Sequence, residues 1–266
     1  MGAEGSYEHL RIERDGDVLR LVIDVANDPM NLVTPELHDD LVAVVSRLRS
    51  HPDARAVMLS AEGRAFSAGG DIERLMPGMQ DSSKRERIRL HTHQLLVDLL
   101  DIPMPVVVAV QGHAVGLAAS LVLLCDVIVM SRKAKLIDPH ITIGIVPGDG
   151  GAVAWPLTLG HVLAKRYLLT GDPLPAEEAH RLGLVTELAD PEEVGDVALA
   201  WAHRLAAGPP LALRYTKQAI NGLLRRDALQ ALELSTSLEM LTFATEDHRE
   251  ALAAWRERRE PRFTGR

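Results

Sequence analysis

Short apolar runs alternate with an amphipathic segment early in the chain, and this alternation constrains the fold more than any other feature. Residues 18–25 and 56–60 are short and rich in Val, Leu and Ile, which is typical of buried strands. Between them, residues 34–50 carry apolar side chains at spacings of three and four, and Thr34 and Pro35 form a typical helix start. The order strand, helix, strand predicts an α/β unit.

The same order recurs further along the chain. Residues 105–110 and 126–130 have the composition of strands, and the apolar segment 115–124 between them is predicted to be a helix. No sequence repeat of fixed length accompanies the recurrence. An α/β core is therefore expected.

The pattern changes after Gly160, where helical spacing dominates and strand signals nearly vanish. The helical patterns cover residues 162–170, 175–181, 191–207 and 210 to the end. Pro209-Pro210 is the best boundary, because consecutive prolines disfavour a helix before them and allow one to start after them. We expect an α/β core over residues 1–208 and a helical section over residues 209–266.

The charge balance limits the partners of this chain. Its 266 residues include 29 Lys and Arg against 37 Asp and Glu, a formal net charge of −8. Binding to nucleic acid or to an anionic membrane requires clustered positive charge, so neither partner is expected. The most apolar stretch, residues 116–130, is too short to span a bilayer and contains Asp126.

The cysteine content and the N-terminus point to the cytoplasm. The single cysteine, Cys125, cannot form an internal disulfide and is expected to pack in the core. Residues 1–13 carry charges and no apolar core of a signal peptide. We therefore expect a cytoplasmic protein.

Two glycine-rich turns present accessible backbone. The first, residues 63–72, follows a predicted strand, and its small residues Ala68, Gly69 and Gly70 leave N–H groups open to a ligand oxygen. The second, residues 111–120, enters a predicted helix, where free N–H groups favour negative charge. Two such donors would form an oxyanion hole. The alternatives are an ordinary tight turn and close packing of small residues.

A third segment, residues 138–151, contains His140 and Asp149, nine positions apart. The turn at Pro147-Gly148 would fold Asp149 back toward His140, giving an imidazole oriented by a carboxylate that can act as a general base. The alternative is that Asp149 caps the helix that begins at Gly150 and that His140 lies on the surface.

In this order, the three segments resemble the crotonase superfamily, the enoyl-CoA hydratase and isomerase family. Residues 63–72 are similar to its first oxyanion-hole motif, residues 111–126 to its second, and residues 144–151 to its Gly-x-x-Pro-Gly-x-Gly-Gly turn. Residues 245–265 are similar to the family's tail, an acidic helix and a basic cluster before Pro-x-Phe. The likeness extends from about Val18 to the end of the chain.

The resemblance implies an α/β fold in which ββα units form a spiral, followed by a helical trimerisation section. It implies a homotrimer or homohexamer, an acyl-CoA substrate, and no tightly bound cofactor or metal. It also implies that the N–H groups of Gly70 and Leu117 polarise the thioester carbonyl. The residues expected to contact substrate are Ala68, Ile72, Gly116 and Ser120. The family usually has Gly in place of Leu117, so the acyl pocket is expected to differ here.

The chain departs from the family at two catalytic positions. Hydratases of the family use two glutamates, and the matching positions hold Ser120 and His140. A serine hydroxyl cannot replace a carboxylate base. What remains is His140 with Asp149, and some crotonase relatives, β-diketone hydrolases among them, carry a similar pair that activates water. Leu117 stands where such a hydrolase has a carbonyl-binding histidine.

Three functions remain open. The leading one is a CoA-thioester enzyme of the hydratase/isomerase family in which a His/Asp pair replaces the glutamates. The second is a hydrolase of a β-diketone carbon–carbon bond or of a thioester, and the third is a non-catalytic acyl-CoA binding homologue. Binding of CoA alone would separate the first and third from a CoA-independent diketone hydrolase.

Several other polar segments receive mainly structural interpretations. His91 and His93 favour a solvated helix face over a metal pair, and His113 is expected to pack near the second turn. Residues 73–90 have the composition of a mobile loop that shapes the acyl site. The basic clusters at residues 84–87 and 256–262 fit solvated helix faces or contacts with CoA phosphates.

Overall fold

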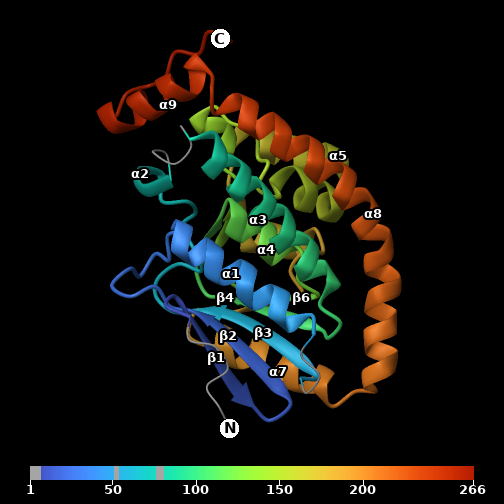
Figure 1. The fold of residues 1–266 in the computed structure, drawn as a ribbon. Helices are drawn as coiled ribbons and strands as arrows, with labels where there is room; N and C mark the ends of the chain where they lie inside the picture. The colour runs from blue at the N-terminus through green and yellow to red at the C-terminus, as the bar shows by residue number, and fades with distance from the viewer. Residues whose placement is uncertain (1–6, 51–53, 76–80) are drawn as a thin grey trace.

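The structure, a computed structural model, describes residues 7–50, 54–75 and 81–266 (Figure 1). The strands are β1 (Leu10–Asp15), β2 (Val18–Ile23), β3 (Ala56–Ala61), β4 (Val106–Val110), β5 (Ala114–Val115), β6 (Val127–Ser131), β7 (Lys135–Ile137), β8 (Leu174–Pro175) and β9 (Glu187–Ala189). The helices are α1 (Pro35–Leu48), α2 (Ile72–Leu75), α3 (Ser82–Asp101), α4 (Leu117–Leu123), the 3-10 helix η2 (His140–Ile143), α5 (Gly151–Thr170), α6 (Ala176–Arg181), α7 (Val194–Ala206), α8 (Pro210–Thr242) and α9 (Glu246–Glu257). Within these ranges, no helix is long and apolar enough to cross a membrane.

A six-stranded sheet with the order β1-β2-β3-β4-β6-β9 underlies the fold. β1 pairs with β2 in antiparallel orientation, and each later pair is parallel. The short strands β5, β7 and β8 form a second sheet. Helices connect the parallel strands, which confirms the predicted α/β class.

The central strands are buried on both faces, and this explains their nearly continuous apolar sequences. Along β3, Ala56 and Met58 pack in the cluster on the α7 side of the sheet. The alternate residues Val57 and Leu59 belong to the larger cluster formed with α1, α3 and α4. Successive side chains of a strand point to opposite faces, so the two clusters share the strand without sharing residues.

The elements predicted in the first half of the chain are confirmed. The expected strands correspond to β2, β3, β4 and β6, and the expected helices to α1 and α4, with ends shifted by one or two residues. Thr34 caps α1 as predicted, because its hydroxyl oxygen accepts the Leu37 N–H at 3.2 Å.

The expectation that strands nearly vanish after Gly160 is incomplete, because β8 and β9 lie there. Their two and three residues are too few to produce a periodic pattern. Helix α5 begins at Gly151, well before the expected residue 162. The sequence pattern placed the start too late because Pro156 and Gly160 interrupt the apolar spacing. Gly160 has a φ of 72° and kinks the helix.

Residues 73–90, expected to form a mobile loop, are helical over much of the described part. The Asp81 carboxylate caps α3 by accepting the N–H groups of Ser83 at 2.9 Å and Lys84 at 3.3 Å. The charged run after Asp81 is therefore the start of a helix. Met76–Met79, part of the same expectation, lies outside the described residues.

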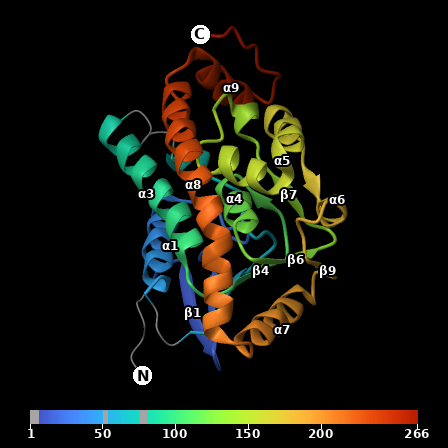
Figure 2. The same ribbon diagram turned by 90° about the vertical axis from the view of Figure 1, so that its right-hand side faces the viewer.

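The C-terminal helix α8 begins at Pro210, next to the predicted boundary, and runs along the core beside α3 and α5 (Figure 2). Lys217 connects it to the core, since its ammonium group lies 2.6 Å from Asp126 Oδ2 and donates to the Met104 carbonyl oxygen at 3.0 Å. Helix α9 then packs against η2, where His248 Nδ1 donates to the Ile143 carbonyl oxygen at 2.7 Å. The helical section thus contacts both the core and η2.

Candidate active site

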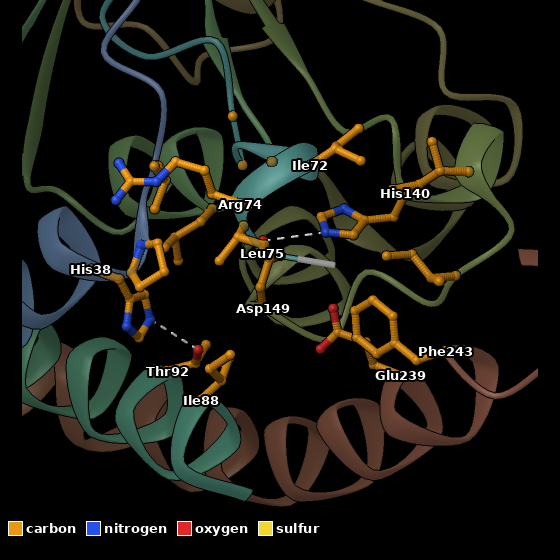
Figure 3. A pocket seen from close by; sticks show the side chains of 18 of the residues that line it. His38, Ile72, Arg74, Leu75, Ile88, Thr92, His140, Asp149, Glu239 and Phe243 are labelled. Carbon is orange, nitrogen blue, oxygen red and sulfur yellow. Dashed lines mark hydrogen bonds and ion pairs between the residues drawn. The ribbon is translucent and has the colours of Figure 1, made fainter. Parts of the chain in front are cut away.

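A cavity of about 630 Å³ lies between the first glycine-rich turn, η2, α3 and α8 (Figure 3). Its walls are mostly apolar, with polar groups at particular points, as in many small-molecule sites. Apolar lining residues include Val33, Leu75, Ile88, Ile145, Met240 and Phe243. Of the residues expected to bind substrate, Ala68, Ile72 and Gly116 line the cavity.

The two glycine-rich turns lie side by side because a short parallel bridge joins them. Ser67 N–H donates to the His113 carbonyl oxygen at 3.2 Å, and Val115 N–H donates to the Ser67 carbonyl oxygen at 3.0 Å. The two segments are far apart in the sequence, yet this bridge brings both to one wall of the cavity.

The Gly70 N–H points away from the neighbouring backbone. Val33 N–H donates to the Gly69 oxygen at 2.8 Å, and the Val33 oxygen accepts the Asp71 N–H at 3.0 Å. In a parallel bridge the residue between these two partners directs its own N–H to the opposite side. Among the described residues, the Gly70 amide donates no hydrogen bond, and Gly70 lines the cavity.

Leu117 presents a second free amide. It is the first residue of α4, so its N–H has no acceptor within the helix, and no other described residue accepts it. Gly116 precedes it with a φ of 59°, and a Cβ atom there would lie 3.5 Å from His140 Cε1. The positive φ is what favours glycine at this turn, because the contact with His140 would be of ordinary length.

His140 lies between two carboxylates. Its Nδ1 is 2.7 Å from Asp138 Oδ1, and its Nε2 is 3.2 Å from Asp149 Oδ2. The residue is 9% exposed and lines the cavity. Burial alone would lower the pKa of His140, but the charges and hydrogen bonds of Asp149 and Asp138 raise it well above its usual value.

The structure brings His140 and Asp149 together as expected from the Pro147-Gly148 turn. Asp149 does not cap α5, because the N-cap position belongs to Gly150 and no side chain bonds there. Sequence reasoning did not identify Asp138 as a partner of His140, although it stands two residues before it. A short spacing of this kind, with an intervening proline, is the signal that would have identified it.

Helix α8 places a further acid in the cavity, which sequence reasoning missed. Glu239 is 6% exposed and lines the same cavity as His140 and Asp149. Burial and the nearby Asp149 raise the pKa of Glu239 to about 8, although His140 acts in the opposite direction.

The comparisons with known proteins point to one family. A family model described as "Enoyl-CoA hydratase/isomerase" matches residues 20–266. The chain belongs to the enoyl-CoA hydratase/isomerase family. It is therefore a crotonase-fold enzyme, as the three sequence segments suggested.

Individual members of the enoyl-CoA hydratase/isomerase family match over most of their length. The "Probable enoyl-CoA hydratase echA8" of Mycobacterium bovis is 30% identical over 263 residues, 98% of this chain and 100% of that protein. A crystal structure of an enoyl-CoA hydratase/isomerase from Mycobacterium paratuberculosis has a TM-score of 0.87 and 36% identity, covering 92% of this chain and 98% of that one. A β-diketone hydrolase from the cyanobacterium Anabaena has a TM-score of 0.84 and 30% identity, covering 89% and 94%.

Not every expected contact of this family member is formed. Ser120 is fully buried and does not line the cavity; its Oγ lies 3.4 Å from the Gly116 oxygen, close to Gly150. The His113 side chain is exposed rather than packed. Cys125 packs against the core as expected, and burial raises the pKa of its thiol.

A polar cluster occupies another part of the cavity wall. His38 Nε2 lies 3.1 Å from Thr92 Oγ1, and burial lowers the pKa of His38 to about 4, so its ring is neutral at pH 7 (Figure 3). His91 stacks on His38 and bonds Asp39 at 2.9 Å. His91 was expected to lie on a solvated helix face. It is only partly exposed, because it also lines the cavity.

Among the residues that the structure describes, two groups of side chains have the spacing to hold a metal ion. They are His38, Asp39 and His91, and Asp138, His140 and Asp149. In both groups some of the ligand atoms contact protein partners. In the second group, Asp138 Oδ2 and Asp149 Oδ1 are buried without a hydrogen-bond partner in the described part of the chain.

Cationic side chains surround part of the cavity of the hydratase/isomerase. Arg74, Lys84, Arg87 and Arg89 all line it. Arg74 is paired with Glu36 at 2.9 Å and Arg89 with Glu86 at 2.8 Å, while Arg87 is paired with Asp39. In the tail cluster, Arg259 binds Glu250. Of the cluster at residues 84–87, Lys84 and Arg87 thus reach the cavity.

Proposed function

We propose that this enzyme acts on an acyl-CoA thioester, with the Gly70 and Leu117 amides as an oxyanion hole and His140 as the general base. The observation that carries the proposal is the position of His140 in the same cavity as two free backbone donors. CoA is then part of the substrate, and no tightly bound cofactor is required. The similarity to a probable enoyl-CoA hydratase of Mycobacterium bovis supports this substrate class.

The two amides would act on the thioester oxygen. When a nucleophile adds to an enoyl thioester, or a base removes its α-proton, negative charge develops on this oxygen. Two preorganised N–H donors stabilise that charge far more than the neutral carbonyl. Because Gly70 and Leu117 donate through their backbones, the replacement of the usual glycine by Leu117 preserves the donor.

His140 would take the proton in its neutral form. If Nδ1–H donates to Asp138, the neutral ring would carry its lone pair on Nε2, the nitrogen beside Asp149. Asp149 faces the same nitrogen at 3.2 Å, so it can hold a water molecule as well as stabilise the imidazolium after proton transfer. Under this proposal Asp138 and Asp149 would share the orienting role that the sequence assigned to Asp149 alone.

These groups can account for each proton and electron-pair movement of hydration, apart from the donor of the α-carbon proton. Water loses a proton to His140 Nε2 while its oxygen bonds to the β-carbon, and the electrons of the double bond move onto the thioester oxygen. The enolate then collapses as its α-carbon takes a proton. Isomerisation uses the same base and the same oxyanion hole, with a carbon-bound proton in place of the water proton.

The second candidate is hydrolysis of a β-diketone carbon–carbon bond or of a thioester. The similarity to the Anabaena β-diketone hydrolase favours it, together with the His140–Asp149 pair. In that reaction the activated water attacks a carbonyl carbon instead of a β-carbon, and the oxyanion hole holds the tetrahedral intermediate.

A substrate panel separates these functions. The panel contains enoyl-CoA thioesters, saturated acyl-CoA thioesters and cyclic β-diketones, each with the wild-type protein, and binding of CoA alone is measured by calorimetry. We expect turnover of at least one enoyl-CoA and measurable CoA binding. Turnover of diketones without CoA binding would instead support the hydrolase, and CoA binding without any turnover would support a binding homologue.

We also infer that residues 209–266 form the oligomerisation section of a homotrimer or homohexamer. Helix α8 leaves three large apolar side chains exposed near its end, Leu234, Leu238 and Leu241, at 62%, 41% and 67%. Apolar side chains at these spacings lie near one another on a helix and would be covered by another copy of the chain.

A further inference from the structure

Helix α8 directs one carboxyl group into the catalytic cavity, and the mechanism above leaves one proton without a donor. We propose that Glu239 is a catalytic acid that delivers a proton to the substrate carbon after His140 has removed one from water. This inference rests on the proposed function, because it assigns the second proton-transfer step of the same reaction.

The position of Glu239 supports direct contact with substrate. The residue lines the cavity together with His140 and Asp149, and its carboxyl group lies on their side of the cavity, beside Phe243 (Figure 3). Among the described residues, no hydrogen bond or ion pair involves this carboxyl group. A buried carboxyl group without a protein partner is costly unless it is neutral or meets a ligand.

The catalytic turn is built around Glu239. A Cβ atom added to Gly148 would lie 2.6 Å from both Cβ and Oε2 of Glu239, so any side chain at position 148 would displace the acid. The same turn is joined to α8 by a hydrogen bond of 3.1 Å from Val146 N–H to Thr242 Oγ1. Glycine at 148 thus allows the residue before Asp149 to pack directly on Glu239.

The surroundings of Glu239 favour its protonated form. Three ionisable groups influence it from neighbouring elements: Asp149 before α5, His140 on η2 and Asp138 after β7. Burial and the two aspartates raise its pKa and His140 lowers it, with a result of about 8. A carboxylic acid with a pKa near the working pH is well suited to donate a proton and regain it.

This assignment supplies a carboxylic acid to a chain that lacks both glutamates of its family. The positions of the two family glutamates hold Ser120 and His140, and Ser120 is outside the cavity wall. Glu239 reaches the cavity from another element. In hydration, His140 gains the water proton and Glu239 gives its proton to the α-carbon. One proton passing from His140 to Glu239, through Asp149 or water, then restores the starting state.

Replacing Glu239 with glutamine tests the role, because the amide keeps the shape of the side chain and cannot supply the proton. With crotonyl-CoA as the probe, Glu239→Gln is expected to lower kcat by about 100-fold or more. It is also expected to abolish the fall in activity above about pH 8, while the dissociation constant of CoA stays within about twofold. The matched control is Asp227→Asn on the exposed side of α8, which is expected to behave as wild type. A kcat and a pH profile of Glu239→Gln equal to those of the wild type would overturn the proposal.

A second readout does not depend on turnover, so failure of the proposed function is distinguishable from failure of this inference. Infrared difference spectroscopy of wild type against Glu239→Gln reports a protonated carboxyl group directly. We expect such a band at pH 7 in the wild type, its loss on titration through about pH 8, and its absence in the variant. Identical spectra at pH 7 would refute a protonated Glu239 even if the enzyme turns over no enoyl-CoA.

Discussion

His140 Nε2 lies 3.2 Å from Asp149 Oδ2, across a turn that brings together residues nine positions apart. The opposite nitrogen of the ring lies 2.7 Å from Asp138. Both ring nitrogens therefore face carboxylates, which raise the pKa of His140 well above its usual value. The base becomes available only when the ring is neutral, which makes the pH dependence of activity a direct report on the pair.

Replacing Asp138 with asparagine is expected to shift the pH profile. Asp138 is one of two carboxylates that raise the pKa of His140, and the active base is the neutral ring, so activity rises as pH increases through that pKa. Removing one negative charge lowers the pKa. The rising limb of kcat/KM against pH should then move to lower pH in Asp138→Asn, and a limb that stays in place or moves upward would contradict this assignment.

Asp149→Asn discriminates a catalytic role from a capping role. An amide cannot stabilise the imidazolium, so turnover is expected to fall by about 100-fold or more. Asparagine is as good an N-cap as aspartate, so a capping residue would tolerate the change in both rate and stability. Steady-state kinetics and urea unfolding of the same preparation separate the two roles, and wild-type rates would contradict the catalytic role.

Gly70→Pro removes one proposed donor of the oxyanion hole. A loss of about 100-fold or more in kcat is expected, the usual effect of losing one such donor. Gly70→Ala is the matched control, since it keeps the N–H, and the added Cβ would meet only the mobile end of Leu75 at 2.9 Å. Circular dichroism must show that both variants are folded. Equal activity of the two variants would place the oxyanion hole elsewhere.

The assembly state follows from the exposed side chains of α8. Multi-angle light scattering at micromolar concentration is expected to give a trimer or a hexamer. Leu241→Glu places a charge in the apolar surface and should shift the protein toward smaller species. Glu233→Gln, on an outward-facing position of the same helix, is the control. A stable wild-type monomer would count against an oligomerisation section.

The parallel core could be predicted from the sequence because its strands are buried on both faces. Val57 and Val108 belong to nearly continuous apolar runs, and such runs are visible without any tertiary information. β9 could not be found, because Glu187–Ala189 is short and partly exposed and is defined only by pairing with β6. The early start of α5 was hidden by Pro156.

The candidate site divides in the same way. Gly70 and His140 stand in local motifs whose residue types alone suggest chemistry. Glu239 stands on a helix whose pattern indicated only an oligomerisation surface, and its approach to Asp149 depends on how α8 packs across the core. Gly148 leaves room for Glu239, but the sequence alone does not show why glycine is needed there. The reason becomes visible only when α8 is seen packed against the turn before α5.

The most direct test of the account is turnover of His140→Ala on an enoyl-CoA that the wild type accepts, measured beside its affinity for CoA. The matched control is His203→Ala on α7, which is exposed and lies on the other side of the sheet. The account predicts a loss of kcat on the order of 1,000-fold with CoA affinity within about twofold of wild type, because binding does not use the base. Retention of wild-type turnover by folded His140→Ala would contradict it.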